Sequence, residues 1–246
     1  MRSKLMFRQL VLAFALTFAT VSVSAGNMQV APTSIELSAA KAADGLTLSN
    51  FDDAVLTAQV RIFKWTLVNG QDVLEPTTDL VASPAMMKVP AKGTQLIRVI
   101  RTSRAPVAQE QAYRIIVDEI PVASARQSVA ATQVSSGLKF AIRYSVPVFV
   151  VPGDTASQTA LKVSIAPHDK AGESVLTFHN AGTTRAQISN IQRDSQMLAP
   201  GLAGYALAGM SKKVVLTTQP AIAAGQSLNV DVNGVTQKLL VDSGAP

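Results

Sequence analysis

The chain has 246 residues, of which 22 are Lys or Arg, 16 are Asp or Glu and none is Cys, for a formal net charge of +6. The absence of cysteine excludes disulfide bonds and thiolate chemistry, so each core must be held together by packing alone. The sequence has no run of Lys and Arg and no interleaving of basic with aromatic residues, which argues against a nucleic acid partner.

The first 25 residues predict a secretory signal peptide. Arg2, Lys4 and Arg8 precede an apolar run from Leu10 to Val23, and the small residues that follow it favour cleavage after Ala25. The run is too short for a bilayer span, although an uncleaved N-terminal anchor is the alternative. Cleavage would remove 3 of the 22 basic residues and none of the 16 acidic ones, leaving a net charge of +3.

Short runs of Val, Ile and Thr, separated by Gly, Asn, Pro and Asp, predict an all-β chain built from antiparallel sandwiches. The Asn-Gly pair between Val68 and Gln71 predicts a tight turn, because it tolerates positive φ. The strands predicted before Pro152 are Met28–Val30, Ser34–Leu37, Gly45–Ser49, Val55–Trp65, Met86–Val89, Gln95–Arg104, Gln111–Ile120 and Leu138–Val150.

A Pro-Gly pair at Pro152 and Gly153 predicts a domain boundary, because Pro donates no ladder hydrogen bond and Gly frees the backbone. We therefore expect an N-terminal domain over 26–152 and a C-terminal β-sandwich domain over 153–246, and we expect the latter to be the looser of the two because its stretch Leu198–Met210 is rich in Ala and Gly. The strands predicted after Gly153 are Lys162–Ala166, Ser174–Asn180, Ala186–Arg193, Lys213–Thr217, Ser227–Val232 and Val235–Val241.

No enzyme signature is present. The two histidines, His168 and His179, lack the close His, Cys or Asp partners that metal sites need. Nucleophile-elbow, P-loop and dinucleotide glycine patterns are missing, and the glycines at Gly201, Gly204 and Gly209 are expected in loops. We therefore expect no catalysis, no cofactor, no metal and no small-molecule substrate.

Four extended segments carry a resemblance to a known family. The first is Val30-Ala-Pro-Thr-Ser-Ile-Glu-Leu37, and the second is the basic strand Gly93-Thr-Gln-Leu-Ile-Arg-Val-Ile-Arg101. The third is Ala112-Tyr-Arg-Ile-Ile-Val-Asp-Glu-Ile-Pro121, and the fourth alternates from Leu138 and ends in Val-Pro-Val-Phe-Val-Val-Pro152. In order and spacing they resemble the periplasmic chaperones of chaperone–usher pilus assembly, from about Met28 to Pro152.

The resemblance implies two immunoglobulin-like domains in a boomerang arrangement and a periplasmic location. It also implies that the seventh strand of the first domain is lent to a pilus subunit whose own sandwich lacks a strand. The subunit is then passed to an outer-membrane usher. In physical terms this is strand addition, in which main-chain hydrogen bonds give pairing and alternate side chains enter pockets.

The residues that match the lent row are Leu138, Phe140, Ile142 and Tyr144. Period-two alternation places them on one face of the strand, opposite Lys139, Ala141, Arg143 and Ser145. The alternative is that they belong to the core of this protein's own sandwich. The preceding polar stretch after Pro121 has the character of a loop that either orders on binding or is a plain connector.

The sequence departs from better-known family members, which hold the subunit's terminal carboxylate with an Arg on the first strand and a Lys on the seventh. Here Thr33 or Ser34 and Pro147 stand at those places. An Arg can clamp a carboxylate through two parallel hydrogen bonds. The candidates to anchor the carboxylate are Arg114, then Arg98 and Arg101, with ordinary solvated strand faces as the alternative.

The family's ion pair between its domains is also incomplete in the sequence. Glu119 stands for its acid, whereas Val151 stands where an Arg is expected. Together with the missing carboxylate cations, this resembles the divergent, archaic branch of the family.

Two other functions compete with the chaperone. A secreted structural or adhesive subunit of a surface polymer would carry its donor strand at the mature N-terminus, but the segment Gly26–Ala31 is too short for that role. A secreted β-sandwich hydrolase is disfavoured by the lack of a nucleophile motif.

Overall fold

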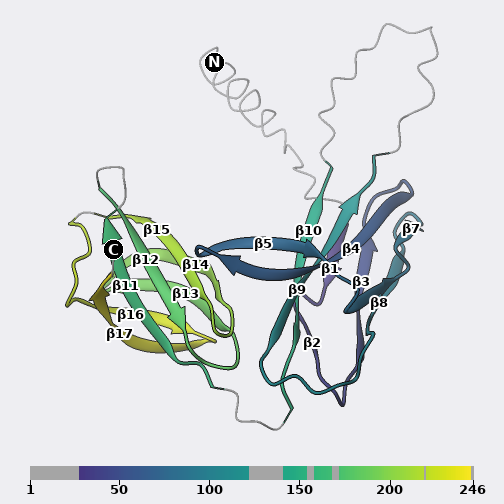
Figure 1. The fold of residues 1–246 in the computed structure, drawn as a ribbon. Helices are drawn as coiled ribbons and strands as arrows, with labels where there is room; N and C mark the ends of the chain where they lie inside the picture. Colours follow the sequence, from purple (N-terminus) through teal and green to yellow (C-terminus); the bar gives the residue numbers. More distant parts are fainter. Residues whose placement is uncertain (1–27, 122–140, 154–157, 168–171, 219, 245–246) are drawn as a thin grey trace, which may run out of the picture.

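Alternating apolar residues and turn-forming Asn, Gly and Pro give strands along the whole described chain (Figure 1). The computed structural model describes residues 28–121, 141–153, 158–167, 172–218 and 220–244. Within these ranges the regular elements are all strands, so no helix long and apolar enough to cross a membrane is present there.

Ten strands form the N-terminal domain. They are β1 (Met28–Ala31), β2 (Ile35–Leu37), β3 (Ala43–Asn50), β4 (Leu56–Val68), β5 (Gln71–Pro76), β6 (Leu80–Ser83), β7 (Met86–Val89), β8 (Thr94–Arg101), β9 (Gln111–Glu119) and β10 (Arg143–Val150). A four-stranded sheet has the order β1-β3-β8-β6. A six-stranded sheet has the order β2-β10-β9-β4-β5, with β7 also paired to β4.

The core of this domain lies between the two sheets, because each strand turns alternate residues inward. On β8, Ile97 and Val99 are fully buried while Leu96 and Arg98 face outward. On β9, Ile115 is among the side chains that meet them from the other sheet. Each fully buried side chain of this size contributes about 1.5–3 kcal/mol.

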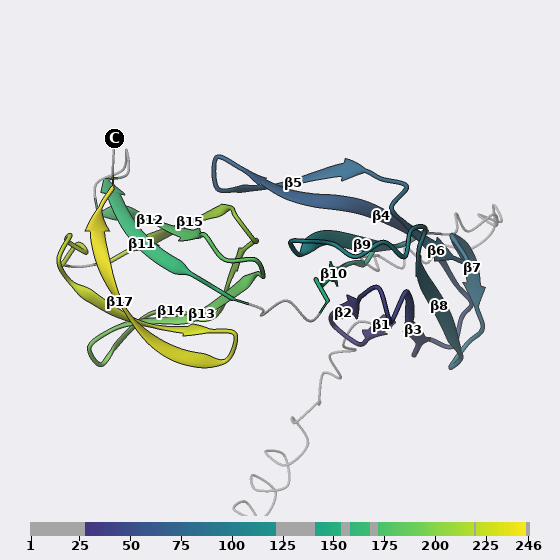
Figure 2. The same ribbon diagram turned by 60° about the horizontal axis from the view of Figure 1, so that its bottom comes forward.

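Seven strands form the C-terminal domain. They are β11 (Leu161–Pro167), β12 (Glu173–Asn180), β13 (Ala186–Arg193), β14 (Gln196–Ala206), β15 (Ser211–Thr217), β16 (Ser227–Val232) and β17 (Val235–Ser243). Their order is β14-β13-β16-β17-β11-β12-β15. All seven contribute buried side chains to one core, Phe178, Ile188 and Val230 among them, so the sheet folds over on itself (Figure 2).

The β4–β5 hairpin reaches across to the C-terminal domain in both views (Figures 1 and 2). Its turn is the predicted Asn-Gly turn, with positive φ at Asn69 (53°) and Gly70 (79°). The Gly70 carbonyl accepts a hydrogen bond of 3.2 Å from the backbone N–H of Lys213, and a Cβ at Gly70 would come within 2.4 Å of the Lys213 side chain. Glycine is therefore required both by the backbone and by the contact.

Most predicted strands are present with small shifts of their ends, and three strands were missed. The strand expected over Gln95–Arg104 ends at Arg101, and His179 lies within β12. The loop expected at Gly201 and Gly204 is wrong, because both glycines belong to β14, whereas Gly209 lies in a turn. The missed strands are β5, β6 and β14. The domain boundary at Pro152 and Gly153 stays a prediction; β10 ends at Val150 and β11 begins at Leu161.

Candidate functional site

Strand β10 has a free edge. It pairs with β9 along its whole length, from Arg143 to Val150, but β2 pairs with its other edge only from Val148 onward. Within the described ranges, the edge from Arg143 to Pro147 therefore has no partner strand. An unpaired edge of this kind is a template for an added strand.

The backbone groups on that edge can be assigned from their neighbours. The Val151 N–H donates to the Leu37 carbonyl of β2, whereas the Ile142 carbonyl accepts from the N–H of Glu119, the last residue of β9. Because the groups alternate between the two edges, those of Arg143 and Ser145 point to the free edge. Pro147, the last residue on that edge, has no N–H to leave unpaired.

The two described residues of the predicted row, Ile142 and Tyr144, lie at the start of β10 on the core side of the sheet. Ile142 and Tyr144 pack, partly buried, against the N-terminal core, and the Tyr144 hydroxyl donates to the Met28 carbonyl at 2.6 Å. Leu138 and Phe140 lie outside the described residues. In this structure, then, two of the four residues contact their own domain. Their role as a lent row stays a prediction.

One face of the six-stranded sheet covers the N-terminal core. The other face carries Trp65 and Phe149, which pack against Tyr205 of the C-terminal domain, and we call it the cleft face. On this face, near the start of β10, Asp118 forms ion pairs with both Arg143 and Arg61, and its distance to Arg61 is 2.6 Å. Burial alone would raise the pKa of the Asp118 carboxyl, but the hydrogen bonds from Arg143 and Arg61 lower it overall. This carboxylate therefore ties the first residue of β10 to β4.

Arg114 lies on the cleft face directly opposite Pro147 in the β9–β10 ladder. Its guanidinium carbon is 3.7 Å from the ring centroid of Trp65 and 5.8 Å from that of Tyr205 in the C-terminal domain. Burial lowers the pKa of this guanidinium. Among the described residues it makes no hydrogen bond or ion pair, and Asp72 and Tyr205 are the groups that raise its pKa against the effect of burial.

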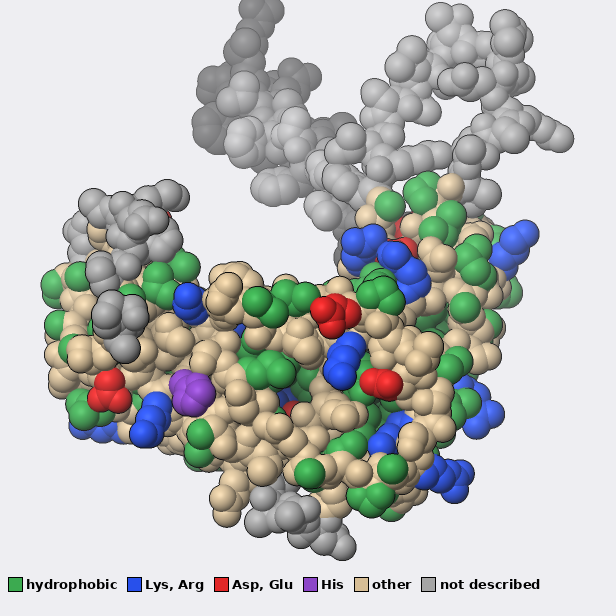
Figure 3. Space-filling view, viewed as in Figure 1, with side chains coloured by type: hydrophobic (Ala, Val, Ile, Leu, Met, Phe, Trp, Pro, Cys, Tyr) green, Lys and Arg blue, Asp and Glu red, His purple; other side chains and the backbone are tan. Residues whose placement is uncertain are grey.

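Three aromatic rings join the two domains beneath Arg114. Trp65 and Phe149 belong to the cleft face, and Tyr205 belongs to β14. The Trp65 and Tyr205 rings meet edge to face with centroids 5.4 Å apart, and Phe149 is 5.8 Å from Tyr205. Figure 3 shows the surface hollowed between the two lobes.

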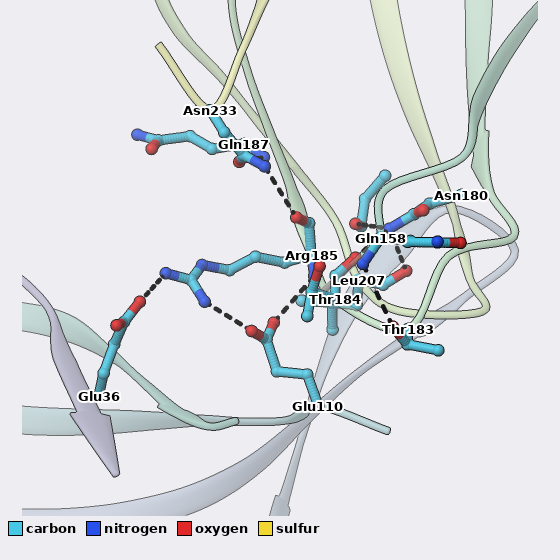
Figure 4. Close-up of polar contacts among 11 residues, drawn as sticks. Glu36, Glu110, Gln158, Asn180, Thr183, Thr184, Arg185, Gln187, Leu207 and Asn233 are labelled. Atoms are coloured by element: carbon cyan, nitrogen blue, oxygen red, sulfur yellow. Dashed lines mark hydrogen bonds and ion pairs between the residues drawn. The ribbon is translucent and has the colours of Figure 1, made fainter. Parts of the chain in front are cut away.

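A second contact between the domains is an ion network (Figure 4). Arg185, at the start of β13, reaches Glu110 at 2.6 Å and also contacts Glu36 on β2. Its backbone N–H donates to Glu110 at 3.0 Å, and its guanidinium carbon lies 3.8 Å from the ring centroid of Phe149. Burial raises the pKa of the Glu110 carboxyl, because the nearby Arg185 offsets the desolvation only in part.

Comparison of the sequence with models of protein families identifies the family of this chain. Residues 27–156, more than half of the chain, match the family model described as the pili and flagellar-assembly chaperones, PapD N-terminal domain. The chain belongs to this chaperone family. A search of curated proteins finds no match.

Solved structures share the fold of the chaperone over most of its length. The structure of the CsuC–CsuE chaperone–tip subunit complex from archaic Csu pili of Acinetobacter baumannii gives a TM-score of 0.69 at 20% identity, covering 89% of this chain and 100% of that one. The Salmonella enterica SafA pilin–SafB chaperone complex gives a TM-score of 0.60 at 13% identity, covering 89% of this chain and 98% of that one. The Escherichia coli chaperone DraB gives a TM-score of 0.57 at 15% identity, covering 88% of this chain and 96% of that one. The prediction of a two-domain, all-β chaperone fold is confirmed.

The three predicted anchor cations lie in different parts of the chaperone. Arg114 is on the cleft face, but β8, which carries Arg98 and Arg101, belongs to the four-stranded sheet on the far side of the N-terminal domain (Figures 1 and 2). Arg98 faces outward, and Arg101 is buried and donates to the Ala105 carbonyl at 2.9 Å. This placement favours Arg114, and the anchoring role itself stays a prediction.

The ion network between the domains was not predicted from the sequence. We expected an incomplete pair from Glu119 and Val151; instead Glu110 and Arg185 form the pair, and Glu119 accepts from the Ile142 backbone at 3.2 Å. Glu110 and Arg185 each lie immediately before a predicted strand, which was the only sequence signal. Sequence spacing cannot show that two such strand starts in different domains meet.

The chaperone variant Arg185→Met is expected to lose about 3 kcal/mol in the free energy of unfolding, because it leaves the buried Glu110 carboxylate without its partner. Urea unfolding followed by tryptophan fluorescence measures this. The double variant Arg185→Met/Glu110→Gln should recover about half of the loss, since the unpaired charge is removed. A loss below about 1 kcal/mol in the single variant would show that the pair acts only as an exposed one.

Proposed function

We propose that the chaperone binds pilus subunits by lending them β10 as the strand that their sandwich lacks. The observation that carries the proposal is the free edge of β10 from Arg143 to Pro147, in a member of the pilus-assembly chaperones. A subunit strand paired there would continue the six-stranded sheet across the two proteins. Side chains of the alternating row would enter the groove that the missing strand leaves open.

The free edge also fixes where such a strand ends. Because β2 runs parallel to β10 and occupies its edge from Val148, a subunit strand in line with β2 must stop beside Pro147. If it too runs parallel to β10, its carboxyl end arrives there. Arg114 is the register partner of Pro147 on β9, so its guanidinium is the cation nearest to that end along the ladder. We assign to Arg114 the capture of the terminal carboxylate.

The proposal includes a location and a route. The signal peptide predicted over the first 25 residues would deliver the chaperone to the periplasm, and an outer-membrane usher would receive the subunit from it. The work requires no cofactor and no bond chemistry, since binding and release are strand pairing and exchange. The deviations at Thr33, Ser34 and Pro147, with the likeness to the archaic Csu complex, support assignment to the archaic branch.

The experiment that tests this function is co-expression with small secreted proteins encoded by neighbouring genes. We expect at least one of them to accumulate and to become protease-resistant only with the chaperone present. Hydrogen exchange should show new protection at the Arg143 and Ser145 amides in that complex, because these point to the free edge. Capture of a client with no change in exchange at either amide would contradict strand lending.

A further inference from the structure

A second cation approaches the cleft from the C-terminal domain. Lys212, the second residue of β15, has a side chain that is only 12% exposed. A Cβ at Gly204 on β14 would meet the Cε of Lys212 at 3.0 Å, so the lysine stem lies directly against a glycine backbone. The buried stem leaves the ammonium group as the part of the side chain that reaches the cleft.

The ammonium group of Lys212 is held by Asp72 of the β4–β5 hairpin. Its Nζ is 3.1 Å from Asp72 Oδ1, and the same oxygen accepts a hydrogen bond of 3.2 Å from Trp65 Nε1. The ring of that tryptophan carries the Arg114 guanidinium on its face. Arg114, Lys212 and Asp72 are thus gathered around one indole ring, with two positive charges and one negative charge.

We propose that Lys212 is the second cation of the carboxylate-anchoring site, kept in place before binding by Asp72. This inference rests on the proposed function. One net positive charge on the three residues is neutralised by one arriving carboxylate, which Arg114 receives from the N-terminal domain and Lys212 from the C-terminal domain. The lent strand itself carries the uncharged Pro147 opposite Arg114, so the second cation of the site comes from the other lobe.

The net charge of this site predicts that two substitutions change the affinity for a terminal carboxylate in opposite directions. Lys212→Met removes the excess positive charge and should weaken binding of a terminal carboxylate about tenfold, the effect of one charge-assisted contact. Asp72→Asn keeps an oxygen for Trp65 Nε1 but removes the competing charge, so it should tighten binding several-fold. A merely structural contact between Lys212 and Asp72 would make both substitutions act in the same direction.

The test uses the full-length mature chaperone and a short peptide of alternating Val and Thr that ends in Phe and carries fluorescein at its N-terminus, made once with a free C-terminal carboxylate and once as the amide. Dissociation constants are measured by fluorescence anisotropy for wild type, Lys212→Met and Asp72→Asn. We expect the opposite shifts with the acid peptide and none with the amide. Lys238→Met is the matched control, because this exposed lysine lies on β17, which pairs with neither β14 nor β15.

Each other outcome overturns a defined part of the inference. If wild type binds the acid peptide better than the amide and Lys212→Met binds both as wild type does, Lys212 is not an anchor and the proposed function stands. If acid and amide bind equally, no carboxylate site exists. If neither peptide binds, strand lending itself fails and the inference fails with it.

Discussion

A chaperone carrying both Phe140→Arg and Ile142→Arg is expected to lose subunit rescue while remaining soluble. Each apolar side chain of the lent row that enters a subunit groove contributes about 1.5–3 kcal/mol, and two guanidinium groups cannot enter the same groove without losing their hydration. Affinity should therefore fall by roughly a hundredfold or more. The measurement is the level of a co-expressed subunit in periplasmic extracts.

The control is Ala141→Arg, which places one guanidinium group, half the charge that the double variant adds, at an exposed position between the two substituted residues. Ile142 is partly buried against its own domain, so the free double variant should be less stable by about 1 kcal/mol but still folded. Thermal unfolding of the purified variants separates the two effects. Normal subunit levels with a folded double variant would show that Phe140 and Ile142 serve only the chaperone's own core.

Arg114→Ala is expected to reduce subunit affinity by about 10- to 100-fold, because one charge-assisted hydrogen bond to a carboxylate contributes about 1.5–3 kcal/mol. Arg114→Lys should recover only part of this, since a lysine lacks the planar pair of donors and the flat contact with Trp65. Co-purification of subunit with tagged chaperone measures both.

Loss of the stacked guanidinium also affects the free chaperone, by about 0.5–2 kcal/mol, so urea unfolding must accompany the binding assay. Arg98→Ala is the control, because Arg98 faces outward from the four-stranded sheet. If Arg114→Ala captures subunit as wild type does and Arg98→Ala does not, the anchor lies on the far sheet and the assignment is wrong.

The sequence predicted the strands that carry strong alternation. The strand predicted over Ala186–Arg193 and the Asn-Gly turn before β5 are both found in the structure. These features are local, since side-chain period and turn chemistry depend only on neighbouring residues. The family and the fold class followed from several such segments in the right order.

What the sequence could not predict depends on distant or irregular pairing. Strand β5 is exposed at nearly every position, so it has no apolar alternation to read. Strand β14 contains Gly201 and Gly204 at positive φ and shifts its register against β13, which gives it the composition of a loop. The approach of Arg185 to Glu110, and of Lys212 to Asp72, depends on how two lobes meet, and no local pattern encodes that.

The position at which β2 joins β10 has a consequence for the range of clients. Since Val148 is already paired, the proposed strand lending would end every subunit strand beside Pro147, whatever the sequence of that strand. The chaperone backbone would then set the register of the bound strand. Different subunits that share only alternating apolar residues and a free C-terminus could therefore bind the same chaperone. Which subunit is bound would then depend on the relative concentrations of the subunits and on later steps of export.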